Sequence, residues 1–72
     1  MKLKYIMTKD DGVIMFSNLI THTEMARKFG GATSAGFVTI DKNYHFETYG
    51  ESVSLRMKPA EDDNEKIERQ LR

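Results

Sequence analysis

Residues 28–38, KFGGATSAGFV, separate a helix-like part of the chain from a strand-rich part. Seven consecutive positions, Gly30 to Gly36, hold only Gly, Ala, Ser or Thr. A glycine can adopt the left-handed backbone that ends a helix, and small side chains let one backbone pass close to another. We therefore predict that this stretch ends a short helix and leads the chain into a sheet.

The same small residues could instead form a nest of backbone amides around an anion. Phosphate-binding loops run from a strand to a helix, so that the helix N-terminus faces the anion. Here a helix comes first and a strand follows, and the chain contains neither G-x-x-x-x-G-K-[ST] nor G-x-G-x-x-G. An RNA-clamping GXXG loop is also absent, because Gly30 and Gly31 are adjacent. The structural interpretation is therefore favoured.

A β-hairpin is predicted over residues 2–17. Apolar and polar residues alternate over 3–7, which is typical of a half-buried strand. The Asp-Gly pair at 11–12 favours a hairpin turn. Residues 13–16, VIMF, are apolar on both faces of a strand, which predicts a central strand or one covered by a helix and a partner.

A short helix is predicted to begin at Thr21. Thr21-His22-Thr23-Glu24 matches the S/T-x-x-E capping box, and Ile20 and Met25 have the spacing of a hydrophobic staple. About two turns of helix are not stable alone, so this helix must dock on the sheet. His22 is expected to be a solvated residue of its first turn.

After the small residues, the pattern predicts a three-stranded meander over 36–57. Its strands are expected at 37–40, 44–49 and 52–57. In the last strand, alternation would place three polar residues, Ser52, Ser54 and Arg56, on one face and three apolar residues, Val53, Leu55 and Met57, on the other.

A charged C-terminal helix is predicted over about 59–71, with Pro59 at its first position. Acidic residues gather at its start and basic residues at its end, as the helix dipole favours. Three acid-first i, i+4 pairs support it, namely Asp62–Lys66, Glu65–Arg69 and Glu68–Arg72. Its apolar stripe is thin, so we expect it to pack loosely or to dock on a partner subunit.

These elements predict a single α+β domain over residues 1–72, in the order ββαβββα, with an antiparallel sheet and the short helix on one face. A chain of 72 residues has a small core, and with no Cys it has no disulfide or thiolate metal site. Oligomerisation is the remaining way to add stability, so a homodimer is predicted. No secretory signal and no membrane-spanning run is recognisable, so a soluble, cytoplasmic protein is expected.

The charge balance argues against nucleic-acid binding. Eleven basic and eleven acidic residues give a net charge of zero, whereas nucleic-acid binders carry a basic excess that neutralises phosphates. A local basic patch remains open, made of Lys2, Lys4, Lys9, Arg27 and Lys28. Four strand aromatics could stack bases, but core packing is the favoured role for Tyr5, Tyr44, Phe46 and Tyr49.

No catalytic or cofactor motif stands out. His22 and His45 lack a second ligand at metal-binding spacing, and the serines lack a G-x-S-x-G elbow. The acidic residues at 61–63 lack the spacing and glycine of an EF-hand. The chain is therefore expected to use no metal or cofactor, to have no catalytic residue and not to be an enzyme.

Three motifs, HTEMA at 22–26, SAGFV at 34–38 and YGESVSL at 49–55, followed by an acidic C-terminal helix, resemble a group of short uncharacterised phage and prophage proteins. The resemblance covers about residues 14–71. Where those proteins carry Gly after the Ser-Leu pair, this chain has Arg56, so any role of that Gly does not transfer. The resemblance implies a phage or mobile-element accessory protein in a bacterial cytoplasm, and it implies no activity.

Three hypotheses follow. The first is a non-enzymatic, dimeric binding module that occupies a host protein through Ser34, Phe37, Tyr49, Glu51, Ser52, Ser54 and Arg56. The second is a binder of a small nucleotide-like ligand at a subunit interface near Ser34 and Glu51, with Arg56 as the cation. The third is a weak nucleic-acid binder that uses the N-terminal lysines, for which steep salt dependence would be the signature.

Overall fold

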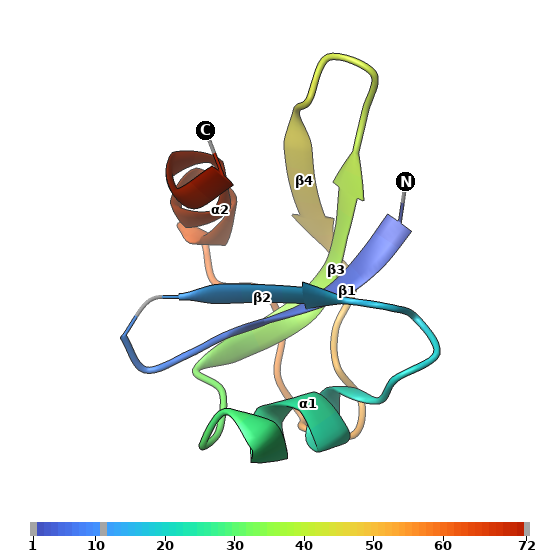
Figure 1. Ribbon diagram of the computed structural model, residues 1–72, viewed down its shortest axis with the longest axis vertical. Helices are drawn as coiled ribbons and strands as arrows, with labels where there is room; N and C mark the ends of the chain where they lie inside the picture. Colours follow the sequence, from blue (N-terminus) through green and yellow to red (C-terminus); the bar gives the residue numbers. More distant parts are fainter. Residues whose placement is uncertain (1, 11, 72) are drawn as a thin grey trace.

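The computed structural model describes residues 2–10 and 12–71. Six elements follow one another, and they are β1 (Lys2–Met7), β2 (Val13–Phe16), α1 (His22–Lys28), β3 (Ser34–Ile40), β4 (Phe46–Tyr49) and α2 (Asp63–Leu71). The four strands form one antiparallel sheet in the order β2-β1-β3-β4 (Figure 1). The predicted α+β class with an antiparallel sheet is confirmed.

The N-terminal hairpin confirms the prediction for residues 2–17. β1 pairs with β2 from Lys4 opposite Phe16 to Met7 opposite Val13. The Thr8 amide donates to the Gly12 carbonyl at 2.9 Å and closes the turn. Asp11, half of the predicted Asp-Gly pair, lies outside the described residues.

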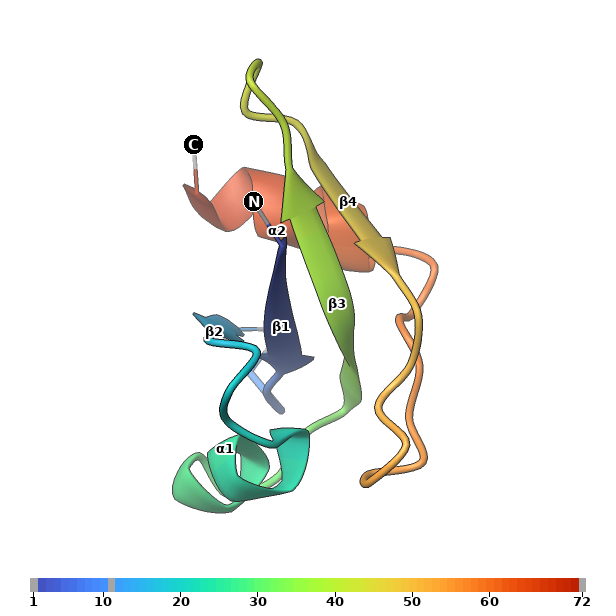
Figure 2. The ribbon, with the colours of Figure 1, turned by 90° about the vertical axis from the view of Figure 1, so that its right-hand side faces the viewer.

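The two faces of the sheet carry separate apolar clusters because alternate residues of each strand point to opposite sides. On one face Tyr5, Met7 and Val38 pack with Ile67 of α2. On the other face Ile6, Phe16 and Ala35 pack with Ala26 of α1. Figure 2 shows α2 crossing the strands behind the sheet, while α1 covers only the end of the opposite face.

The start of α1 follows the predicted cap. The Thr21 hydroxyl accepts from the Glu24 amide at 3.1 Å. The Glu24 carboxylate accepts from the same hydroxyl, at 3.1 Å, in place of the expected Thr21 amide. Ile20 and Met25 both pack against the same cluster, as a hydrophobic staple requires.

The small-residue stretch combines a helix end with the first half of a strand. Gly30 and Gly31 have positive φ, and the Gly31 amide donates to the Ala26 carbonyl at 2.8 Å, which is the outer bond of a Schellman motif. β3 then begins at Ser34, earlier than the predicted strand start at 37. At Gly36 a Cβ atom would lie 2.7 Å from Pro59 Cγ, so this glycine lets a later segment cross the strand.

The predicted third strand of the meander is wrong. Residues 52–57 form a tight hairpin, hereafter the 52–57 hairpin, joined by one isolated bridge between Ser52 and Met57. Leu55 and Met57 turn inward against the α1-side cluster, whereas Val53 is 80% exposed. Alternation fails here because the chain reverses within the run, and Arg56 takes a left-handed backbone at φ 55°. The predicted polar row of Ser52, Ser54 and Arg56 therefore does not form.

The C-terminal helix begins at Asp63, four residues after its predicted start at Pro59. The Pro59 ring lies against Gly36 of β3. The Ala60 amide donates to the Asp63 carboxylate at 2.9 Å, just before the helix begins. The Asp62–Lys66 and Glu65–Arg69 pairs are confirmed, at 3.4 and 3.2 Å. Arg72, the base of the third pair, lies outside the described residues.

Side-chain amides of α2 bind both edges of the sheet. The Asn64 side chain accepts from the Thr48 amide of β4 at 2.7 Å, and the Gln70 side chain accepts from the Val13 amide of β2 at 2.9 Å. Between them Ile67 is fully buried. The helix thus packs along the whole width of its own sheet, held at each end by a polar contact and in the middle by an apolar one.

Candidate functional site

Two of the seven sequence-predicted contact residues are buried. Ser34 is 4% exposed, and its hydroxyl donates to Asp63 Oδ2 at 2.7 Å. Ser52 is 1% exposed, and its hydroxyl accepts from the Leu55 amide at 3.2 Å inside the 52–57 hairpin. Both serines therefore bond within the fold, and neither is exposed in the single chain.

Ser34 belongs to a buried network centred on Asp63. Asp63 is fully buried, and its Oδ2 accepts from Tyr5 Oη at 2.6 Å, Ser34 Oγ at 2.7 Å and the Ala60 amide at 2.9 Å. Burial first, and then the Asp63 carboxylate, raise the pKa of the Tyr5 phenol well above its ordinary value. Among the described residues Asp63 Oδ1 has no hydrogen-bond partner. The network joins β1, β3 and α2, and its place under the helix gives it a structural role.

Phe37 and Tyr49 are brought together on the α1 side of the sheet. They are paired across β3 and β4, and their rings lie 5.6 Å apart with a tilt of 31°. Phe37 also meets the His22 ring edge-on at 5.5 Å, and His22 meets Phe16 in the same way at 5.5 Å. A row of aromatic rings thus runs from the buried core under α1 out to Tyr49, which is 41% exposed.

His22 is buried, which corrects the prediction of a solvated first-turn residue. It is 4% exposed, and its Nε2 lies 2.8 Å from the Gly36 carbonyl oxygen. Burial lowers the pKa of His22, and the nearby Lys4 charge adds to this, although the Gly36 carbonyl acts in the opposite direction. The ring is placed here because α1 enters over β3, so its first turn faces the sheet and not solvent.

Beyond α1, no helix within residues 2–10 and 12–71 covers the half of this sheet face that lies toward β4 (Figure 2). Its surface, hereafter the open sheet face, consists of Lys2, Phe37, Thr39, Glu47 and Tyr49. A shallow depression of about 370 Å³ is lined by Lys2, Thr39, Glu47 and Tyr49. A second one, of about 310 Å³, adjoins Phe37 and is lined by Lys4, Thr21, His22, Phe37, Glu51, Val53 and Ser54. Glu51 and Ser54 thus lie beside Phe37, as part of the wall next to the open sheet face.

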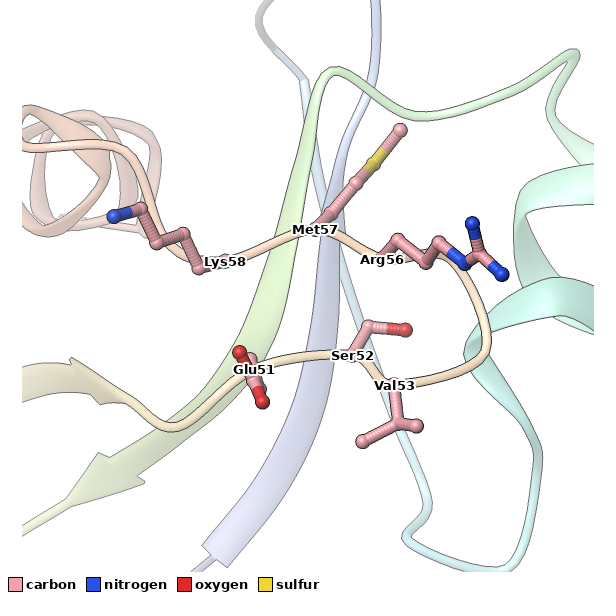
Figure 3. A pocket seen from close by; sticks show the side chains of 6 residues that line it. All are labelled: Glu51, Ser52, Val53, Arg56, Met57 and Lys58. Carbon is pink, nitrogen blue, oxygen red and sulfur yellow. The ribbon is translucent and has the colours of Figure 1, made fainter.

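A third depression, of about 450 Å³, lies over the 52–57 hairpin and includes the predicted cation Arg56 (Figure 3). The basic groups of Arg56 and Lys58 point in opposite directions, and Val53 points away from both. Glu51 adds a carboxylate to the same wall. These charges do not converge on one point, so the hairpin presents no assembled anion site.

The sequence pattern places Lys2 in a possible basic patch, but it does not assign Lys2, Thr39, Glu47 or Val53 to this surface. Lys2 shares a face with Lys4 because both are even-numbered positions of β1, and this alternation is visible in the sequence. Thr39 and Glu47 face each other across β3 and β4, which requires the strand register. Val53 is predicted to share an apolar strand face with Leu55 and Met57, and the reversal at 52–57 brings it to the surface instead.

His45, the second histidine of the chain, interacts with nearby residues. His45 lies in the β3–β4 connection, not on a strand face, and its Nδ1 is 3.6 Å from Asp41 Oδ2. The amides of Asn43 and His45 donate to Asp41 Oδ1, and the hydrogen bond from His45 is the main cause of a lowered Asp41 pKa. Residues 2–10 and 12–71 contain no group of three His, Cys, Asp or Glu side chains placed to hold a metal ion. Neither helix within them is both long and apolar enough to cross a membrane.

Comparison with protein-family models, with curated proteins and with solved structures found no match to this chain. The functional argument therefore rests on the geometry of the open sheet face and its surroundings.

Proposed function

We propose that this chain is a non-catalytic binding module that recognises a segment of another protein through the open sheet face. The supporting observation is the Phe37–Tyr49 ring pair, in which Phe37 packs against His22 of α1 and Tyr49 extends beyond the helix and is 41% exposed. Aromatic side chains with a rigid packed base are the usual anchors of protein interfaces. The resemblance to phage and prophage proteins makes a host protein the proposed target.

The charge pattern around the rings favours a protein partner over a nucleic acid. Lys2 and Lys4 bring positive charge from β1, while Glu47 and Glu51 bring negative charge to the same side. A phosphate backbone gains affinity from a surface of one sign, and it would be repelled by both glutamates. A protein segment with both signs of charge fits this arrangement, because complementary potentials set specificity and register.

The residue that tests the proposal is Tyr49, with Tyr44 as its matched control. Both are exposed tyrosines, but Tyr44 lies in the β3–β4 connection, outside the open sheet face. A photo-crosslinking phenylalanine analogue placed at 49 should capture a protein partner in the host cell, and the same analogue at 44 should not. The captured protein is then purified, and its affinity for the chain is measured by calorimetry.

Charge exchange provides the second arm of the test. Lys2→Glu combined with Glu47→Lys keeps the composition and net charge but inverts the pattern on the open sheet face. We expect Tyr49→Ala and this double exchange each to weaken the purified complex at least about tenfold, which corresponds to about 1.4 kcal/mol. The melting temperature of each variant shows whether it remains folded. Equal crosslinking at 44 and 49, or affinity unchanged in both folded variants, would refute the proposal.

A further inference from the structure

The outer edge of β2 has backbone hydrogen-bonding groups that pair with no other strand of the described residues. β2 is the terminal strand of the sheet on the side away from β4 (Figure 2). Its Val13 amide points outward, because it binds Gln70 of α2 and not β1. Outward groups alternate along an antiparallel strand, so the amide and carbonyl of Met15 point the same way. The hydrogen bonds of the described residues leave this Met15 amide without a partner.

Apart from the Gln70 side chain on Val13, the described residues of β2 carry none of the features that normally prevent strand pairing. Natural edges carry Lys, Pro, bulges or inward charges. The four residues of β2 are Val, Ile, Met and Phe, in continuous register with β1 and without a bulge. The opposite edge differs in charge, since β4 contains Glu47. At each edge a side-chain amide of α2 occupies one outward amide, Asn64 at Thr48 and Gln70 at Val13.

Apolar surface also gathers near this edge. Leu71 follows Gln70, whose side chain binds β2, and it is 45% exposed. Val13, Ile14 and Met15 are themselves only half-buried beneath the two helices.

We propose that β2 pairs antiparallel with β2 of a second copy of this chain, with Met15 opposite Met15 on the twofold axis. An uncharged strand can lie against itself without placing like charges opposite each other, which makes the edge self-complementary. With Met15 at the centre, its outward amide and carbonyl bond their counterparts in the second copy. Because Gln70 keeps the outward amide of Val13, the backbone pairing is limited to the two hydrogen bonds between the Met15 residues. Two four-stranded sheets would join into one of eight strands, independently of the open sheet face.

The test is sedimentation equilibrium of the wild-type chain and of two variants at one position. Met15→Lys places two ammonium groups opposite each other at the axis, while its aliphatic stem keeps the packing of methionine. Met15→Gln is the neutral control of similar length. We expect a reversible monomer–dimer equilibrium in the wild-type chain and in Met15→Gln, and a dissociation constant at least about tenfold higher in Met15→Lys. Thermal melting below the dissociation constant shows whether each monomer is folded.

Amide hydrogen exchange gives a readout that does not depend on a variant folding. As wild-type protein concentration rises, exchange at Met15 should slow, while exchange at the outward amide of Thr48 should not change. A chain that stays monomeric up to about 1 mM overturns the proposal, as does a dimer unaffected by folded Met15→Lys. Protection of Met15 by an added extended peptide, in a chain that remains monomeric, would also overturn it and assign this edge to a foreign strand.

Discussion

The buried Tyr5–Asp63 hydrogen bond allows the sharpest quantitative prediction. Tyr5 Oη lies 2.6 Å from Asp63 Oδ2, and both residues are 0% exposed. A hydrogen bond to a charged group contributes about 1.5–3 kcal/mol net. Tyr5→Phe removes the hydroxyl and little else, because the ring still fills the same space between β1 and α2. We expect the free energy of unfolding to fall by about 1.5–3 kcal/mol.

That loss is large for a chain of 72 residues. At about 0.05–0.15 kcal/mol per residue its total stability is about 4–11 kcal/mol. A domain of this size loses about 4–8 °C of melting temperature per kcal/mol, so Tyr5→Phe should melt at least about 6 °C lower. Urea denaturation followed by circular dichroism measures the change. Tyr49→Phe, at an exposed tyrosine, is the control and should stay within about 0.5 kcal/mol.

A double-mutant cycle separates the charged hydrogen bond from simple packing. In an Asp63→Asn background the acceptor is neutral, so the cost of Tyr5→Phe should fall to about 0.5–1.5 kcal/mol. The same cost in both backgrounds would mean that the carboxylate charge is irrelevant. A cost below about 0.5 kcal/mol in the wild-type background would refute the assignment of this network as the anchor of α2.

Alkaline pH tests the same bond without changing Asp63. The Tyr5 pKa is raised in the folded state, so above pH about 10 the unfolded chain loses its phenolic proton while the folded chain keeps it. The unfolded state then binds fewer protons, and stability falls with pH by up to about 1.4 kcal/mol per unit. The loss of stability should begin near the pKa of the unfolded tyrosine, at about pH 10, and should increase as the pH rises further. In Tyr5→Phe, stability should fall less steeply with pH, because the variant lacks this phenol.

Three further predictions concern other buried positions. Because the His22 pKa is lowered, the unfolded chain takes up the proton first, and stability should decline as pH falls below about 6.5; urea midpoints of His22→Gln should lack this component. Gly36→Ala drives a Cβ atom to 2.7 Å from the Pro59 ring and should cost about 1–3 kcal/mol in thermal melts; adding Pro59→Ala should recover part of that loss, and no recovery would exclude the ring as the obstacle. Ile67→Ala should cost about 2–5 kcal/mol by chemical denaturation, and a smaller loss would mean that α2 is not packed at its centre.

Local signals in the sequence predicted the local structure well. The Thr21 cap, the Gly30 helix end and the i, i+4 pairs of the last helix each depend on residues within a few positions of one another. The hairpin at 2–17 was found because period-two alternation persists through β1. In each case the physical cause and the sequence pattern span the same short segment.

The errors have long-range causes. Residues 52–57 alternate as a strand would, but the chain reverses there, and Leu55 and Met57 pack on the α1-side cluster. Pro59 suits a helix start, yet it lies against Gly36, 23 positions earlier. Asp63, one of several acids in a row, is the one that tertiary packing buries against Tyr5, 58 positions away. Nothing within a few residues distinguishes these positions from their neighbours.

The candidate surface was only partly predictable for the same reason. Phe37 and Tyr49 were recognised individually, but their contact follows from the register of β3 with β4. Ser34 and Ser52 are predicted contact residues, and packing buries both. Lys2 belongs to the predicted basic patch, and alternation alone places it on this face.

The two faces of the sheet differ in how much of each a helix covers. We expect the fully covered face to maintain the fold and the partly covered face to bind a partner. On the α2 side, Asp63, Ile67 and the side-chain amides of Asn64 and Gln70 hold one helix across all four strands. On the α1 side, the short helix covers one end (Figure 2) and leaves Tyr49 41% exposed beside Phe37. Substitutions on the open sheet face can therefore change binding while the α2 face maintains the fold, which is the property that the Tyr49 and charge-exchange experiments require.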